Sequence, residues 1–239
     1  FGIYRIRKGI AKEFELQKRQ NNFLLTVTHE LKTPLAALKL YLQTLQKHNL
    51  TEEKKESIID GALSENERLV QLIENILNTS RAENKAFELN KETIDLSLLS
   101  AQLTERYQKR YKSLRFKIAI PDGLNLKADP NMLETILVNL LENAIKYGGA
   151  TQEIAIKAVP LDRFITLTIS DEGPGIAANE RTHIFEKFYR IGNEDTRKAS
   201  GSGLGLYLVA ELVHLHKGQV RCQENHPRGC VFEVILPYE

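Results

Sequence analysis

The sequence is poor in cysteine: only Cys222 and Cys230 occur among its 239 residues, and neither has a Cys or His at metal-binding spacing beside it. This scarcity excludes a disulfide scaffold and a structural zinc site, and it fits a reducing compartment. Because both cysteines flank a predicted turn, we interpret them as small buried residues rather than as a redox pair.

An excess of charge of one sign is also missing. Lys plus Arg number 33 and Asp plus Glu number 31, so the net formal charge is only +2. This balance excludes the electrostatic footprint of a general nucleic-acid binder, and we expect no nucleic-acid partner. No run of about 18 apolar residues occurs, and the N-terminus lacks the order of a signal peptide, so we expect the chain as given to be soluble.

The composition is that of a folded protein. Apolar residues make up 42% of the chain and charged residues 27%, close to the globular average. The length allows one large domain or two modest ones.

The first twenty residues hold a local excess of basic side chains. Six residues in this segment are basic, and only Glu13 and Glu15 are acidic. The basic residues are Arg5, Arg7, Lys8, Lys12, Lys18 and Arg19. The chain opens at Phe1 without a Met. Two readings stay open, the cytoplasmic end of a membrane helix and a solvated helix start in a truncated chain.

Two apolar stripes then predict a pair of helices. The first helix runs to about His48, the turn follows at residues 49–53, and steps of three and four residues mark each stripe. The stripes are Phe23, Val27, Leu31, Leu35, Leu38, Leu42 and Leu45, and then Ile58, Ala62, Leu69, Leu72, Ile73, Ile76 and Leu77. A lone antiparallel hairpin cannot cover both stripes, so we expect a homodimeric four-helix bundle. The alternative is packing against the rest of the chain.

After Asn84 the pattern changes to that of an α/β sandwich. Short Ile- and Val-rich runs alternate with helical segments, which predicts helices over one sheet. Strands are expected near residues 114–120, 153–159 and 164–170, and helices near residues 97–111, 130–146 and 204–216. The tail at residues 218–237 predicts a hairpin that turns through residues 225–229.

His29 is the first candidate for chemistry. The segment lacks the second His of a zinc protease helix, because Thr33 stands in its place. His29 lies off the apolar stripe, and a mostly neutral imidazole there is an available nucleophile. Glu30 can hold the proton on the other ring nitrogen, Thr33 can align a water, and Pro34 loosens the helix. The alternative is a surface His before a tolerated kink.

Asn139 and Asn143 form the second candidate. They are four residues apart on one helix face, where two amide oxygens can complete the shell of a Mg²⁺ ion that keeps its waters and phosphate ligands. Lys146 follows nearly one turn later, where it can meet phosphate.

Two glycine-containing segments form the third candidate. Asp171 directly follows a predicted strand, where its carboxylate can accept from an exocyclic amine such as that of adenine, and Gly173 and Gly175 admit a flat ring. Residues 200–206 lead into a helix whose N-terminus can seat phosphates. They match neither a dinucleotide fingerprint nor a Walker loop. Between these segments, residues 181–199 indicate a mobile lid with an aromatic anchor.

In this order the motifs resemble those of the cytoplasmic catalytic core of a sensor histidine kinase of two-component signalling. The resemblance covers nearly the whole chain. Residues 28–34 resemble the H box, 139–147 the N box, 171–175 the first glycine box, 185–190 the F box and 201–205 the second glycine box. Thr28 and Glu172 stand where Ser and Asn are commoner, and neither departure puts activity in doubt.

The resemblance implies an α+β fold in three parts. Residues 1–20 would be a juxtamembrane or signalling helix start. Residues 21–88 would be a helical hairpin that forms a dimeric four-helix bundle for dimerisation and histidine phosphotransfer. Residues 89–239 would be an α/β sandwich ATP-binding domain of the Bergerat type, with a mixed sheet.

The resemblance also implies an activity. The imidazole would take the γ-phosphoryl group of ATP with Mg²⁺ and pass it to an aspartate of a response regulator, with phosphatase activity toward that regulator. The chain would act as a homodimer in the cytoplasmic portion of an inner-membrane receptor, with its sensor and transmembrane segment outside this sequence.

Residue roles follow from the same resemblance. His29 would be the phosphoacceptor, Glu30 its polarising partner and Thr33 the aid to dephosphorylation. Around the nucleotide, Asn143 and Asn139 would hold the metal, and Asp171 would bind the adenine amine. Lys146 and Tyr147 would touch phosphates and ribose or base, and Arg190 would reach phosphate. The residues that would line the site are Gly173, Gly175, Gly201, Gly203, Gly205 and Leu206.

Two other functions share parts of this pattern. A gyrase-type hydrolase needs a carboxylate to activate water, and the amide of Asn139 cannot act as that base. A scaffold that binds nucleotide or regulator without phosphoryl transfer is the other rival, and the intact boxes argue against it.

Overall fold

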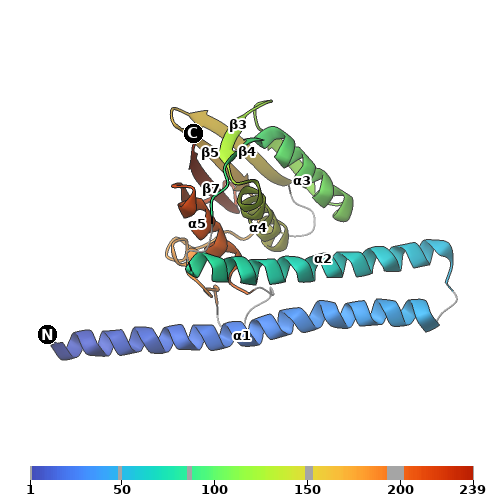
Figure 1. Ribbon diagram of the computed structural model, residues 1–239, viewed down its shortest axis with the longest axis horizontal. Coiled ribbons are helices and arrows are strands. Elements are labelled where there is room, and N and C mark those ends of the chain that lie inside the picture. Colours follow the sequence, from blue (N-terminus) through green and yellow to red (C-terminus); the bar gives the residue numbers. More distant parts are fainter. Residues whose placement is uncertain (1, 48–49, 85–87, 149–152, 193–201, 239) are drawn as a thin grey trace. The chain divides into compact units, whose positions relative to one another are not determined.

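The computed structural model describes residues 2–47, 50–84, 88–148, 153–192 and 202–238. These residues fall into two compact units (Figure 1). The first unit contains the two long helices α1 and α2, and the second contains all of the strands together with the other helices.

The helical unit is a pair of long helices, as the two apolar stripes predict. Helix α1 spans Gly2–Lys47 and helix α2 spans Glu52–Glu83. Helix α1 therefore begins in the basic segment and continues through Pro34 without ending there, while His48 lies outside the described residues. A Cβ atom on Gly61 of α2 would lie 2.8 Å from the Cζ atom of Tyr41 on α1, so glycine at this position permits the close approach of the two helices.

Much of the apolar surface of this unit stays exposed within the chain. Leu35 and Leu42 belong to the predicted stripe of α1, yet their side chains are 61% and 62% exposed. Leu63, Ile73 and Leu77 of α2 are exposed as well. An apolar face of this extent is typical of a surface that a partner covers.

The second unit is built on a mixed five-stranded sheet. Its strands are β2 (Arg115–Ala119), β4 (Glu153–Leu161), β5 (Phe164–Ser170), β7 (Cys230–Pro237) and β6 (Gln219–Glu224), in that spatial order. Strands β2 and β4 are parallel and the other neighbours are antiparallel. The predicted strands and the C-terminal hairpin are therefore confirmed.

Three helices cover one face of this sheet (Figure 1). They are α3 (Leu96–Arg110), α4 (Pro130–Gly148) and α5 (Gly205–Leu215), each close to its predicted range. Side chains of alternate strand positions, such as Ile154, Ile156 and Ile165, are fully buried beneath them. This core holds α4 and α5, which carry two of the sequence motifs, on a rigid support.

A second, smaller sheet was not predicted. Strand β1 (Glu92–Asp95) pairs antiparallel with strand β3 (Asn125–Ala128). Each strand has only four residues, which is too short to show a clear alternation of apolar and polar side chains. The described chain also includes one short 3-10 helix, η1 (His183–Phe185).

Helices α4 and α5 are joined at two points. The backbone N–H of Asp129, just before α4, donates to Nε2 of His216, just after α5, over 3.0 Å. Further along α4, a Cβ atom on Gly205, the first residue of α5, would lie 2.7 Å from Oδ1 of Asn139. The two helices therefore run antiparallel, with the start of α5 beside Asn139.

No helix of the described chain is long and apolar enough to cross a membrane.

Candidate functional site

His29 lies on an exposed part of α1. Its imidazole is open to solvent, and the backbone carbonyl of His29 accepts a hydrogen bond from the Thr33 hydroxyl over 3.1 Å. Thr33 thus occupies the same helix face one turn further on, as the spacing predicts. Pro34 has no backbone N–H to donate to the Glu30 carbonyl, and Glu30 itself is half-buried. The structure therefore offers an accessible nucleophile with a carboxylate as its sequence neighbour.

Asn139 and Asn143 lie on α4, one turn apart. Asn139 is 5% exposed, and its Nδ2 donates to the carbonyl of Thr135 over 2.9 Å. Its Oδ1 lies beside Gly205, at the start of α5. Asn143 is half-buried. In the structure the N box on α4 therefore lies beside the start of α5, the helix that follows the second glycine box.

Asp171 is a buried carboxyl directly after β5. It is 4% exposed, and its Oδ1 accepts from the backbone N–H groups of Gly173 (2.8 Å) and Cys230 (3.3 Å). Its Oδ2 accepts no hydrogen bond from the described residues. Burial raises the pKa of the Asp171 carboxyl, and the two backbone donors oppose that shift. The group is a positioned acceptor with one oxygen available to a ligand.

Gly173 holds this carboxyl against the end of α4. A Cβ atom there would lie 2.8 Å from Oδ1 of Asp171 and 2.8 Å from the carbonyl oxygen of Tyr147. Any larger residue would push apart the first glycine box and the N box. Gly175 has a positive φ of 78°, which glycine adopts without strain.

The turn between β6 and β7 contributes site residues that sequence reasoning missed. Asn225 donates from Nδ2 to the carbonyl of Asp171 over 2.8 Å. A Cβ atom on Gly229 would lie only 1.9 Å from that same carbonyl oxygen. Cys230 makes a second bond to Asp171, because the backbone N–H of Asp171 donates to the Cys230 carbonyl over 3.0 Å while the Cys230 N–H donates to the Asp171 carboxyl. These residues fix the backbone from which the Asp171 carboxyl projects.

The structure describes residues 181–192 of the predicted lid. Phe185 of η1 packs edge-on against Phe232 of β7 with ring centroids 6.5 Å apart, which confirms the aromatic anchor. At the base of this segment, Arg181 donates to the Ile176 carbonyl over 2.8 Å and to Glu224 on β6 over 3.1 Å. The expected mobility of residues 193–199 lies outside the described residues.

The remaining predicted site residues are placed as follows. Lys146 lies with Nζ 5.0 Å from the centroid of the Tyr147 ring, and both side chains are exposed. Arg190 is half-buried, and Leu206 is half-buried in the first turn of α5. Gly203 has a positive φ of 70° just before α5, as a tight loop requires. Gly201 lies outside the described residues.

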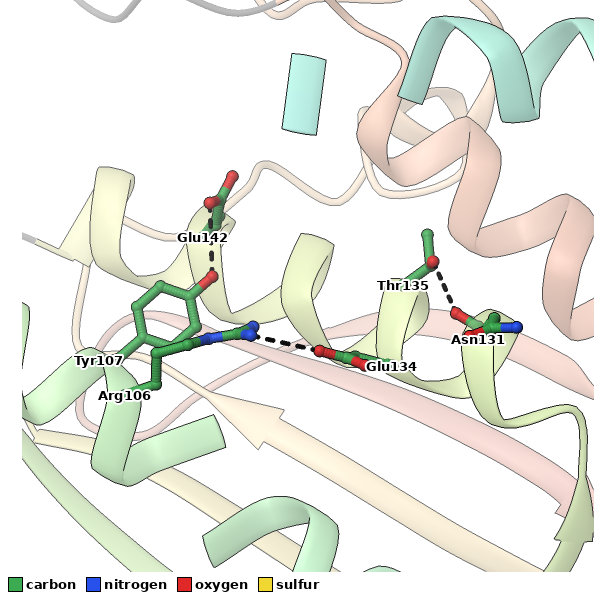
Figure 2. Close-up of polar contacts among 6 residues, drawn as sticks. All are labelled: Arg106, Tyr107, Asn131, Glu134, Thr135 and Glu142. Atoms are coloured by element: carbon green, nitrogen blue, oxygen red, sulfur yellow. Dashed lines mark hydrogen bonds and ion pairs between the residues drawn. The ribbon is translucent and has the colours of Figure 1, made fainter. Parts of the chain in front are cut away.

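Helix α3 is tied to α4 by polar contacts that the sequence did not predict (Figure 2). The Tyr107 hydroxyl donates to Glu142 over 3.3 Å, and Arg106 pairs with Glu134 over 3.3 Å. Burial raises the pKa of the Tyr107 phenol, so it stays a donor. Within α4, the Thr135 hydroxyl donates to the carbonyl of Asn131 over 2.7 Å. These contacts set the face that α4 presents to α3, on the helix that carries the N box.

The described residues contain no group of three or more His, Cys, Asp or Glu side chains that could hold a metal ion. The amide oxygen of Asn143 is a hard ligand of the kind that Mg²⁺ accepts, and Mg²⁺ takes its other ligands from phosphate and water in nucleotide sites. The residues present therefore fit a metal ion that arrives with a nucleotide.

Comparison with known families gives two matches along the chain. Residues 19–85 match the His Kinase A (phospho-acceptor) domain, and residues 128–239 match the family described as histidine kinase-, DNA gyrase B- and HSP90-like ATPase. The first match contains His29, and the second contains the N box and both glycine boxes. The chain belongs to the sensor histidine kinases of two-component signalling and comprises their catalytic core.

Individual relatives agree with this assignment. The sensor protein kinase WalK of Staphylococcus aureus is 28% identical over 242 residues, which cover 100% of this chain and 58% of the relative. Full-length ShkA in complex with AMPPNP has a TM-score of 0.62 and 26% identity, covering 90% of this chain and 45% of that chain. ThkA in complex with the response regulator protein TrrA has a TM-score of 0.60 and 22% identity, covering 95% and 66%. The chain spans between 40% and 58% of the length of the curated relatives it matches.

Proposed function

We propose that this chain autophosphorylates on His29 with ATP and then passes the phosphoryl group to an aspartate of a response regulator. The observation that supports this proposal most directly is the Asp171 carboxyl, which is buried, is fixed by two backbone donors and has one oxygen available. The match to the ATPase family supports ATP as the ligand of that oxygen. His29 is the nucleophile, because it is exposed within the phosphoacceptor match.

Adenine recognition rests on Asp171. Oδ2 of Asp171 accepts a hydrogen bond from the exocyclic amine of adenine, while Gly173 and Gly175 let the ring lie close to the backbone. Tyr147 contacts the ribose or base. The N-terminus of α5 and the loop at Gly203 and Gly205 supply backbone N–H groups and a positive dipole end to the phosphates.

Charge on the triphosphate is balanced by two basic side chains and a metal ion. Lys146 and Arg190 pair with phosphate oxygens, and Asn143, with Asn139 near it, holds Mg²⁺ through an amide oxygen. When bound, Mg²⁺ supplies charge neutralisation on the phosphates. The chain itself contributes positioning, since little covalent chemistry falls to the protein in phosphoryl transfer.

The transfer itself uses His29 and its neighbours. A ring nitrogen of the imidazole forms a bond to the γ-phosphorus of ATP, the bond from that phosphorus to the bridging oxygen breaks, and ADP leaves. Glu30 stabilises the positive charge that develops on the ring. A carboxylate oxygen of the regulator's aspartate then attacks the phosphorus and frees the imidazole. Thr33 aligns the water that later removes the phosphoryl group from the regulator.

The partners follow from the helical unit. Its exposed apolar side chains, including Leu35, Leu42 and Leu63, support a homodimeric four-helix bundle. ThkA, which shares the fold, is seen with its response regulator TrrA, and this supports a receiver domain as the second partner. The basic start of α1 supports a place next to a membrane, in the cytoplasmic portion of a receptor.

The decisive experiment labels the chain with γ-labelled ATP and Mg²⁺. Label that is lost in acid and kept in alkali, and that is absent from His29→Gln, establishes a phosphohistidine at this position. Label that persists in the variant moves the acceptor elsewhere. Release of free phosphate without any labelled protein would instead support the rival hydrolase.

Two further variants test the assigned roles. Asn143→Ala abolishes labelling while the dimer stays intact, and Asn131→Ala, an exposed Asn on the same helix, is its control. Thr33→Ala keeps autophosphorylation but slows removal of phosphate from the regulator. Its control is Thr44→Ala, because the Thr44 hydroxyl makes the same kind of bond to a carbonyl one turn back, that of Leu40 at 2.8 Å.

A further inference from the structure

The two cysteines of the chain are neighbours on adjacent strands. Cys222 of β6 lies opposite Phe232 of β7, and Cys230 of β7 lies opposite Glu224 of β6. The two cysteines are therefore diagonal neighbours, and their side chains point to the same face of the sheet. Both are free thiols, 8% and 5% exposed. The sequence favoured a packing role for the two cysteines, because the sequence alone does not show that they are neighbours on adjacent strands.

The cysteine pair is attached to the adenine-binding carboxyl. Cys230 donates its backbone N–H to Oδ1 of Asp171 and accepts from the Asp171 N–H. The turn that joins the two cysteine-bearing strands holds the Asp171 carbonyl through Asn225 and lies against it at Gly229. Any shift of β6 against β7 is therefore transmitted to Asp171.

The two thiols have different chemical character. Their mutual influence raises the pKa of Cys222, which burial raises further, and lowers the pKa of Cys230, which burial opposes. The Cys222 S–H donates to the Gln223 carbonyl over 3.9 Å, and Cys230 is the thiol that ionises more readily. A thiolate beside a second thiol is the arrangement in which oxidation ends in a disulfide.

We propose that Cys222 and Cys230 form a reversible disulfide that controls nucleotide binding at Asp171. This inference rests on the proposed function, in which Asp171 receives the adenine amine. The oxidant is a peroxide. The Cys230 thiolate attacks one peroxide oxygen and hydroxide leaves, which gives a sulfenic acid. The Cys222 sulfur then attacks the sulfenic sulfur, the S–S bond forms, and the hydroxyl leaves as water with the Cys222 proton. A thiol reductant reverses the reaction.

Geometry explains how the disulfide acts at a distance. Diagonal neighbours on antiparallel strands stand about 7–8 Å apart between their Cα atoms, whereas the Cα atoms of a disulfide usually stand about 4.4–6.8 Å apart. The bond therefore pulls β6 and β7 out of their register. Gly229 has no space to absorb this shift, because even a Cβ atom there would meet the Asp171 carbonyl at 1.9 Å. The Asp171 carboxyl moves, and the nucleotide loses its acceptor.

The test compares the full chain before and after treatment with hydrogen peroxide. Intact mass spectrometry measures the loss of two hydrogen atoms, peptide mapping identifies the linked cysteines, and calorimetry measures affinity for a non-hydrolysable ATP analogue. We expect the wild-type chain to form the Cys222–Cys230 link and to lose affinity by about tenfold or more, which dithiothreitol restores. The Cys222→Ala variant binds the analogue like the reduced wild-type chain and keeps that affinity, within about twofold, after peroxide.

Each outcome distinguishes the redox inference from the proposed function. If reduced wild type binds the analogue and linked wild type binds it equally well, the control is overturned and the proposed function stands. Equal loss of affinity in Cys222→Ala after peroxide also overturns it, because no disulfide can form there. If peroxide leaves both thiols free, the inference fails in its first step. If the reduced wild-type chain does not bind the analogue, the proposed function fails, and control of binding fails with it.

Discussion

The side-chain amide of Asn225 donates a 2.8 Å hydrogen bond to the backbone carbonyl of Asp171, 54 residues earlier in the chain. The bond joins the turn of the β6–β7 hairpin to the loop that carries the carboxyl proposed to bind adenine. It acts on backbone and leaves the Asp171 carboxylate free for its ligand. Under the proposed function, Asn225 would therefore position Asp171 for nucleotide binding.

Removal of this bond tests that role. We expect Asn225→Ala to weaken binding of an ATP analogue severalfold and to lower the free energy of unfolding by about 1–2 kcal/mol, because the carbonyl of Asp171 loses its donor. Calorimetry and urea unfolding measure the two effects. Gln219→Ala, at an exposed position of β6, the strand that leads into this turn, is the control and should change neither. Unchanged affinity in Asn225→Ala would show that the turn does not position Asp171.

The contact between Gly229 and Asp171 leads to a second prediction. Gly229 and Gly123 both have positive φ, 108° and 68°, but only a Cβ atom on Gly229 would collide with backbone, and nothing lies within 4 Å of a Cβ atom on Gly123. Gly123→Ala therefore reports backbone strain alone, about 1 kcal/mol, whereas Gly229→Ala should cost about 3 kcal/mol or more. Thermal unfolding of both variants measures the difference. Equal costs would contradict the close packing of the turn on the Asp171 loop.

The local part of the site could be predicted from the sequence. Asp171 does follow a strand, and Asn139 and Asn143 do share a helix, because strand alternation and helix periodicity are properties of short segments. Asn225 and Cys230 could not be predicted as site residues. They reach Asp171 across 54 and 59 residues, and the contacts go to backbone groups or come from them, which leaves no pattern in the side chains.

The fold likewise has parts that the sequence predicts and parts that it does not. The strands of the large sheet were predicted because their Ile and Val side chains are buried on one face. The β1–β3 pair was missed because four-residue strands carry too little pattern. The helical residues of α1 before Phe23 were not marked by an apolar stripe, because charged side chains interrupt the pattern there, yet helix formation tolerates such residues.

The buried Asp171 carboxyl leads to a third prediction, in which stability and binding change differently. Burial raises the folded-state pKa of Asp171, so this group contributes its stability below the unfolded pKa near 3.8 and loses that contribution as pH rises through the folded pKa. At neutral pH the ionised carboxyl is therefore the less favourable occupant of this site.

We expect Asp171→Asn to be at least as stable as wild type at neutral pH, because its amide oxygen keeps the donors of Gly173 and Cys230 without the charge. It should lose ATP binding, since an amide that spends its oxygen on those donors presents N–H groups to the adenine amine. Urea unfolding and calorimetry at neutral pH measure the two properties. A variant that unfolds more easily yet still binds the analogue would refute both halves of the argument.

His216 leads to a fourth prediction, on acid sensitivity. Its ring is 2% exposed, with Nδ1 2.8 Å from the Leu212 carbonyl and Nε2 accepting from the Asp129 N–H. Burial lowers the pKa of His216, nearby Lys91 acts in the same direction, and the Leu212 bond and Asp129 oppose them. The neutral ring is therefore the folded form, with the proton on Nδ1.

The direction of the pH effect follows from that lowered pKa. His216 contributes stability above its unfolded pKa near 6.5 and loses it as pH falls toward the folded pKa, because a protonated Nε2 can no longer accept from Asp129. We expect the wild-type chain to lose about 1 kcal/mol or more relative to His216→Gln between about pH 7.5 and pH 5. Urea unfolding across this range measures the difference, and His214→Gln, at an exposed position near the end of α5, should follow wild type. A His216→Gln variant whose stability falls with acid as steeply as that of wild type would assign the acid sensitivity to other groups.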